Sequence, residues 1–271
     1  MSATISVIVI AKNEAEMIAN CLESLQWCDE IIVIDNESSD ATAELAKRSG
    51  ARVITSTAAT FSEIRNKGLQ TAKTDWVLYI DADERVTPKL ASEITQAIMK
   101  SEATAYSLTR RNILYGHEMQ HGGWQNDEVV RLFKREAIIT WHGEVHEHAE
   151  VSGQQLKLST PLWHLTHRNI VSGLLKTAEW TPVEAKLLYE ANVPAVTLFT
   201  LLRKGGMSVW RHAVRKQGYK DGVAGWVEAL VQGMNRMLVY MQVWEMQQKP
   251  TLDERYTQLE EVIAKEWQRQ P

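Results

Sequence analysis

The segment WVLYIDADERVTP, residues 76–88, places acidic side chains directly after an apolar stretch. Residues 76–80 are typical of a buried strand, and Asp81, Asp83 and Glu84 follow where that strand would end. Asp81 and Asp83 are two residues apart, so their carboxylates can point the same way. Two converging carboxylates repel each other unless a positive group lies between them.

Two other apolar runs, residues 5–11 and 30–35, are also followed by polar side chains at the point where a strand would end. The polar residues at these two ends are Asn13, Glu14, Asp35 and Asp40. Each acid on its own could be a solvated loop residue or could favour the positive end of a helix dipole. Three such clusters at one sheet edge concentrate negative charge, and a divalent cation would neutralise it.

The chemistry expected at this edge is the binding of a nucleotide diphosphate with magnesium or manganese. These ions take carboxylate oxygens and leave coordination positions open for phosphate oxygens. The chain has neither a GxGxxG sequence nor a P-loop, so the phosphates would be held by the metal and by side chains. Arg65 is one candidate for that contact.

Strand and helix patterns alternate along the first hundred residues. Strands are expected at 5–11, 30–35, 51–56, 76–80 and 105–109, and helices at 12–27, 38–50, 61–73 and 87–101. Such alternation predicts an α/β fold with a mainly parallel, Rossmann-like sheet covered by helices on both faces. Ligands of such sheets bind outside the carboxyl ends of the strands.

The composition is that of an ordinary globular protein of 271 residues with 44% hydrophobic and 24% charged residues. A net charge of −4 gives no reason to expect nucleic acid as a partner. Cys21 and Cys28 are too few for a disulfide scaffold, which favours a reducing cytoplasm. The N-terminal sequence has no signal-peptide pattern, and no apolar run is long enough to span a bilayer.

Several motifs, taken in order, resemble glycosyltransferase family 2, the inverting nucleotide-sugar transferases of the GT-A fold. They are SVIVIAKNEAEMIANCLESL, IIVIDNESSDAT, RNKGL and WVLYIDADERVTP. The form DNESSD, with the later HGGWQNDEVVRLFKR and GEVHEH, resembles the branch that adds a β-1,4-linked glucose to the inner core of lipopolysaccharide or lipooligosaccharide. The sequence GYKDGVAGWVEAL is similar to the tail of that branch.

The resemblance implies a role for each acidic cluster. Asn13, Glu14 and Asp35 would line the pocket for the base and ribose, with Asp40 and Arg65 near the nucleotide. Asp81 and Asp83 would form the DxD motif. Asp83 would bind the metal directly, and Asp81 would face the ribose or the metal.

The same resemblance implies a metal-assisted single displacement from UDP-glucose, in which a carboxylate deprotonates the acceptor hydroxyl. Asp127 is the leading candidate for this base, because it lies four residues before Arg131, where the family often has an acid. Glu147 is the second candidate and Glu128 the third. Asp127 and Glu128 could instead simply begin a surface strand or helix.

Several histidines and acids gather shortly after the strand-like RLFKR sequence. They are His142, Glu144, His146, Glu147 and His148. Their spacing suits neither a helical HExxH site nor a zinc finger, so a structural zinc is disfavoured. These residues would shape the acceptor side or close over the diphosphate, and a histidine could also bind the metal.

Residues 166–271 lose the strand pattern and are expected to form a helical C-terminal region. Residues 1–165 would be the GT-A domain, with a donor half of about 1–105 and an acceptor half of about 106–165. Residues 201–220 contain six basic residues and no acid, with Trp210 and Tyr219 between them. They could be a solvated face, or they could seat the protein on an anionic membrane.

The expected function is therefore transfer of a sugar to a lipid-linked oligosaccharide, at the cytoplasmic face of the inner membrane. Two alternatives are kept. One is a transferase of the same fold that acts on a polyprenyl phosphate or a peptide, and the other is a non-catalytic module that binds a nucleotide or glycan. A homo-oligomer is also compatible with the apolar helices of the C-terminal region.

Overall fold

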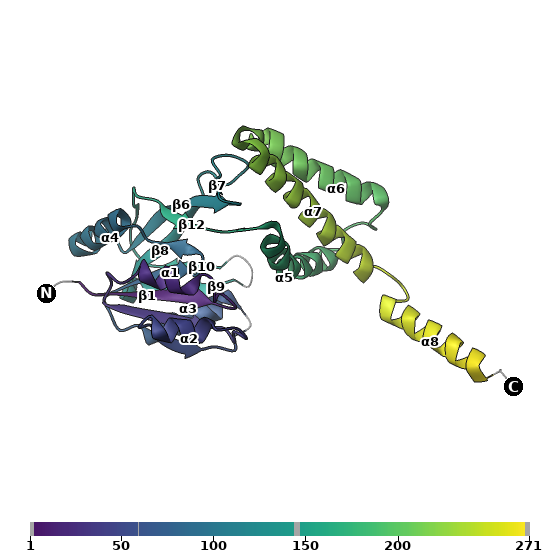
Figure 1. Cartoon of the computed structure of the whole chain (residues 1–271), viewed down its shortest axis with the longest axis horizontal. Coiled ribbons are helices and arrows are strands. Elements are labelled where there is room, and N and C mark those ends of the chain that lie inside the picture. The colour runs from purple at the N-terminus through teal and green to yellow at the C-terminus, as the bar shows by residue number, and fades with distance from the viewer. Residues whose placement is uncertain (1–2, 59, 144–146, 269–271) are drawn as a thin grey trace. The chain divides into compact units, whose positions relative to one another are not determined.

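The computed structural model describes residues 3–58, 60–143 and 147–268, which form two compact units (Figure 1). The first unit is built from residues 1–113 and 126–166, and the second from 114–125 and 167–271. The segment 114–125 thus belongs with the C-terminal helices, although it lies within the expected first region. The division of that region into donor and acceptor halves stays a prediction.

The first unit contains a mixed, mostly parallel sheet. Its strands, in spatial order, are β3 (Arg52–Thr55), β2 (Glu30–Asp35), β1 (Ile5–Ala11), β4 (Trp76–Asp81), β8 (Glu128–Lys134), β6 (Ala105–Leu114), β12 (Leu162–His164) and β5 (Glu84–Arg85). Strands β3, β2, β1 and β4 are parallel to one another, whereas β8 runs antiparallel between β4 and β6. β11 (Gln155–Lys157) pairs with β6, and β9 (Ile138–His142) pairs with β10 (His148–Val151).

The register of the parallel strands brings their polar ends together. Ala11 at the end of β1 is paired with Asp35 at the end of β2, and Ile10 is paired with Asp81 at the end of β4. The loops that follow these strands therefore leave the sheet at the same edge, as parallel strands require.

Helices cover both faces of this sheet. They are α1 (Ile18–Glu23), α2 (Thr42–Arg48), α3 (Phe61–Thr71) and α4 (Pro88–Lys100), with a 3₁₀ turn, η1, at Arg135–Ala137. Side chains alternate along β1, so Val7 and Val9 lie in one core cluster with Leu22, while Ile8 lies in the other with Ile64 of α3. The predicted fold class, an α/β sheet with flanking helices and a helical C-terminal region, is confirmed.

Two helix starts show how local sequence sets the boundaries. Thr87 caps α4 by accepting a hydrogen bond from the backbone N–H of Leu90 at 3.2 Å, and Pro88 occupies the first turn, as its fixed φ favours. The helix expected from residue 12 begins only at Ile18. Asn13 has a φ of 54°, in the left-handed region, so the chain forms a polar loop before the helix starts.

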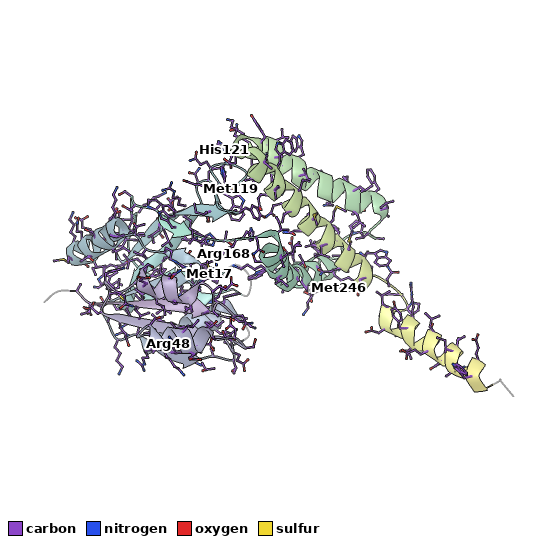
Figure 2. All side chains as sticks on the ribbon, in the orientation of Figure 1. Met17, Arg48, Met119, His121, Arg168 and Met246 are labelled. Atoms are coloured by element: carbon purple, nitrogen blue, oxygen red, sulfur yellow. The ribbon has the colours of Figure 1, made fainter. Side chains whose placement is uncertain are left out.

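The second unit is mainly helical. Its elements are β7 (His117–Glu118), α5 (Ile170–Glu190), α6 (Leu198–Trp210), the π-helical turn η2 (Arg211–Arg215), the 3₁₀ turn η3 (Gly218–Asp221), α7 (Gly222–Met246) and α8 (Leu252–Gln268). The segment 114–125 is held by buried carboxylates: His121 Nδ1 lies 2.9 Å from Asp221 Oδ1, and Tyr115 donates to Glu228 at 2.9 Å. Figure 2 labels His121. Of the helices in the described residues, none has both the length and the apolar character needed to cross a bilayer.

Gly68 provides a test of how closely α3 packs on the sheet. A Cβ atom at Gly68 would lie 2.5 Å from Ile8 Cγ2, and Ile8 is fully buried. Overpacking a core costs about 1–3 kcal/mol, whereas replacing a helical glycine by alanine gains only about 1 kcal/mol. We expect Gly68→Ala to lower the melting temperature measured by differential scanning calorimetry.

Gly206 of α6 is the matched control, because a Cβ atom there would meet nothing within 4 Å. We expect Gly206→Ala to raise the melting temperature of its unit. A gain in stability from Gly68→Ala would contradict the close packing of α3 on β1.

Candidate active site

The carboxylate of Asp81, at the end of β4, lies among three arginine side chains. Arg131 Nη2 is 2.5 Å from Asp81 Oδ2, Arg110 Nη2 is 3.4 Å from the same oxygen, and Arg65 Nη2 is 3.4 Å from Oδ1. Burial alone would raise the pKa of Asp81, but the three guanidinium groups outweigh burial and lower the pKa to about 2. Asp81 is therefore ionised at neutral pH and strongly engaged.

The buried carboxylate of Glu84 pairs with two of these arginines, Arg110 and Arg131. Its side chain is fully buried, and its Oε2 accepts a hydrogen bond from the backbone N–H of Asp81 at 2.9 Å. Its Oε1 lies 2.8 Å from Arg110 Nε and 3.8 Å from Arg131 Nη2. A buried carboxylate needs such positive partners, so Glu84 and the two arginines fix one another's positions.

Arg65 connects α3 to the same cluster and is only 2% exposed. Its guanidinium lies over the rings of Trp141 and Tyr79, with centroid distances of 4.9 and 5.6 Å. Its Nη2 is 3.0 Å from Glu147 Oε1. Its Nη1 is buried and has no hydrogen-bond partner among the described residues, so one end of the guanidinium can still donate to an additional acceptor.

A second set of contacts runs from Asp83 to Asp127. Asp83 Oδ2 lies 3.4 Å from His164 Nε2, and His164 Nδ1 lies 2.6 Å from Asn112 Oδ1. Asn112 Nδ2 in turn donates to Asp127 Oδ2 at 3.1 Å. A buried asparagine therefore joins a candidate metal ligand to the candidate base.

These contacts fix the tautomer of His164. A carboxylate oxygen of Asp127 can only accept, so the Asn112 amide must present its NH₂ group to Asp127 and its oxygen to His164. His164 Nδ1 must then carry a proton and donate it. Nε2 faces the Asp83 carboxylate, and a proton or a metal cation between these two atoms would satisfy both.

The loops after β1 and β2 are tied together by polar side chains. The amide oxygen of Asn13 accepts from the backbone N–H of Ser39 at 2.8 Å, and the backbone N–H of Glu14 donates to the Thr42 hydroxyl at 2.8 Å. The Asp40 carboxylate accepts from the backbone N–H of Ala15 at 3.1 Å. Asp40 thus helps to hold the two loops in register.

Asp35 differs from these loop residues because its carboxylate is buried and only partly satisfied. Its Oδ2 accepts from the backbone N–H of Ser38 at 3.3 Å. Its Oδ1 is buried without a hydrogen-bond partner among the described residues. An unsatisfied buried acceptor is costly, so this oxygen is a candidate contact for a ligand N–H or O–H group.

Other predicted residues lie apart from this cluster or outside the described residues. Glu128 is exposed and pairs with Lys157 at 2.6 Å, as a surface residue would. His142 Nε2 lies 2.9 Å from Glu150 Oε2 on the small two-stranded sheet. Glu144 and His146 lie outside the described residues.

The charge balance leaves room for a cation. The contacts given above for the described residues join five carboxylates to three guanidiniums, so these groups carry two negative charges in excess when His164 is neutral. These groups are Asp81, Asp83, Glu84, Asp127, Glu147, Arg65, Arg110 and Arg131. Among residues 3–58, 60–143 and 147–268, no three His, Cys, Asp or Glu side chains are arranged as a metal site.

The sequence alone did not identify Glu84, Arg110, Asn112 or His164 as parts of the site. Arg110 and Asn112 are two residues apart on β6, so their side chains leave the same face of the sheet. The polar run TRRN, residues 109–112, inside an otherwise strand-like stretch was the available signal. His164 lies at the end of a three-residue strand that gives little pattern.

Comparison with known proteins gives a family match over the first unit. The model of the family described as Glycosyl transferase family 2 matches residues 6–148. A TPR repeat-containing protein of Synechococcus elongatus is 32% identical over 166 residues, which cover 60% of this chain and 40% of that protein. The chain therefore spans less than half the length of that relative.

Two further similarities extend over more of the chain. The lipopolysaccharide core biosynthesis glycosyltransferase LpsC of Rhizobium meliloti is 22% identical over 261 residues, covering 92% of this chain and 96% of LpsC. The structure of glucosyl-3-phosphoglycerate synthase of Mycobacterium tuberculosis with Mn²⁺, UDP-glucose and glycerol 3-phosphate superposes with a TM-score of 0.48. It is 20% identical, and the match covers 71% of this chain and 81% of that one.

The family model covers more than half of the chain, and its match spans the three strand ends whose acids gather at one edge. The chain belongs to glycosyltransferase family 2.

Proposed function

We propose that the chain transfers glucose from UDP-glucose to a hydroxyl group of the lipopolysaccharide inner core, with inversion at the anomeric carbon. The observation that carries the chemistry is the contact chain from Asp83 through His164 and Asn112 to Asp127. These contacts join Asp83, the proposed cation ligand, to Asp127, the proposed base, and so support the proposal. The name of LpsC, similar over nearly its whole length, supports the acceptor class.

The donor nucleotide would bind at the ends of β1 and β2. Asp35 Oδ1 would accept a hydrogen bond from the base or the ribose, which would satisfy its buried oxygen. Asn13, Glu14 and Asp40 would line this pocket through the loops that they hold in place. Arg65 Nη1 would donate to a diphosphate oxygen.

The donor set fits a magnesium or manganese ion at Asp83. His164 Nε2 and the Asp83 carboxylate would hold the ion, and Asp81, two residues earlier, would face it or the ribose. When bound, the ion would neutralise the charge that grows on the departing diphosphate. Asn112 would keep His164 in the tautomer that leaves Nε2 available.

Asp127 would act as the base. Among the described residues, the recorded contacts of its carboxylate are made by Oδ2, which leaves Oδ1 for an acceptor hydroxyl. As the acceptor oxygen bonds to the anomeric carbon, Asp127 would take the hydroxyl proton, and the bond to the diphosphate would break with its electron pair leaving on the phosphate oxygen. Glu147 is the weaker candidate, because its carboxylate is paired with Arg65.

Nucleotide and metal binding can be tested together by thermal shift. We expect UDP to raise the melting temperature and manganese to increase that rise, because ligands that bind the folded state stabilise it. Asp83→Ala should abolish the manganese effect and keep its fold, whereas Glu128→Ala should behave like the unmodified protein. If UDP fails to bind while another nucleotide does, the UDP-glucose assignment is wrong.

The role of Asp127 can be tested by an isosteric change. Asp127→Asn removes the basic oxygen, so we expect the turnover rate to fall about 10²–10⁴-fold, the usual contribution of a general base. UDP binding measured by calorimetry should be unchanged. The adjacent Glu128→Gln is the control, and equal turnover by both variants would rule out Asp127 as the base.

The link through Asn112 predicts a change in pH dependence. Asn112→Asp keeps the side-chain shape but places a carboxylate beside Asp127, and a like charge raises the pKa of its neighbour. We expect the acid limb of the pH–rate profile to move to higher pH and the lost activity to return as the pH is raised; an unmoved limb would disprove the coupling.

A further inference from the structure

We infer that the outward face of α6 and the π-helical turn after it, residues 198–215, docks on an anionic lipid bilayer. The inference deepens the proposed function and rests on it in one respect, because a lipid-linked acceptor would lie at such a surface. The surface itself is argued from the packing, exposure and charge of the second unit.

Helix α6 carries apolar side chains on two sides. Its inner side packs against α7: a Cβ atom on Gly205 would lie 2.4 Å from Met237 Cγ, and Ser208 donates to the carbonyl oxygen of Gln232 at 3.1 Å. Leu201 packs against the core cluster that contains Val239 and Val243. An ordinary surface helix would present polar residues on its other side.

The outward side of α6 carries large apolar side chains. Leu198 is 72% exposed, Phe199 73%, Leu202 58% and Trp210 56%. Phe199, Leu202 and Trp210 have spacings of three and eight residues, which place them on one side of the helix. Val214 in the following turn is also exposed. Monomeric soluble proteins rarely leave an apolar side of this kind uncovered.

Exposed basic side chains, those of Arg203, Arg211 and Arg215, lie in the same segment as this apolar side, whereas Lys204 lies over the Tyr240 ring of α7. Residues 201–220 contain six basic residues and no acidic residue. The basic residues are Arg203, Lys204, Arg211, Arg215, Lys216 and Lys220. Exposed apolar side chains beside basic ones are the pattern of helices that lie in the headgroup region of anionic membranes.

The charge favours a bilayer over a second copy of the chain. A two-fold interface would place the same basic surface against itself, and like charges would repel. Helix α8 gives the contrast within this protein. Tyr256, Leu259 and Ile263 are exposed on it, but its polar residues include five acids and two bases, which an anionic surface would repel.

Vesicle sedimentation tests the inference without any nucleotide or acceptor. We expect the full chain to bind phosphatidylcholine vesicles that contain phosphatidylglycerol, to release as sodium chloride is raised, and not to bind pure phosphatidylcholine. Reversing Arg203, Arg211 and Arg215 to glutamate should lower binding about tenfold or more. Phe199→Ser combined with Leu202→Ser should also lower it. All five side chains are exposed, so circular dichroism should show an unchanged fold.

The matched control is Tyr256→Ser combined with Leu259→Ser on α8, which should bind vesicles as the unmodified chain does. Equal binding by the charge-reversed variant, or an equal loss in the α8 variant, would overturn the inference. The inference would also be overturned if light scattering showed that the unmodified chain is a dimer and that the α6 variants are monomers. UDP binding should persist in every variant. A failure of the membrane inference can therefore be distinguished from a failure of the proposed sugar transfer.

Discussion

The site depends on the pairing of Asp81 with arginines from three separate elements. Arg65 comes from α3, Arg110 from β6 and Arg131 from β8, and all three reach the end of β4. Without them, an acidic strand end next to Asp83 and Glu84 would be a cluster of repelling charges. The arginines make the cluster stable in the absence of a ligand, while an excess of negative charge persists that a cation can neutralise.

This arrangement explains why the strand order matters for the candidate site. β8 lies between β4 and β6 and is antiparallel to both, so β4 and β6 are parallel to each other. Residues that end β4 and residues midway along β6 therefore meet. Arg110 and Asn112 lie on one face of β6, where one binds the Asp81 cluster and the other joins His164 to Asp127.

Much of the first unit could be predicted from the sequence, because buried parallel strands leave continuous apolar runs and their loops leave acids at a common edge. The ends of β1, β2 and β4 were found in this way, and the fold class followed. The partners of these acids were not predictable, since Arg110, Asn112 and His164 come from strands in the less regular half. Long-range pairing decides where those strands lie, and no local pattern records it. The helical C-terminal region was predicted, but the packing of α6 was not, because helical spacing identifies an apolar side and not what covers it.

The second unit takes in a segment from the middle of the chain, and this has a consequence for how the protein can be divided. His121 is held by the buried Asp221, Tyr115 by the buried Glu228, and Gly122 donates its backbone N–H to the carbonyl oxygen of Lys216. Cutting the chain after residue 166 would strip all three partners from a loop that the remaining half still carries. A shortened chain that keeps only the first unit would therefore need a short replacement turn for residues 114–125. An exchange of C-terminal regions between relatives would succeed only if this loop were exchanged together with the helices.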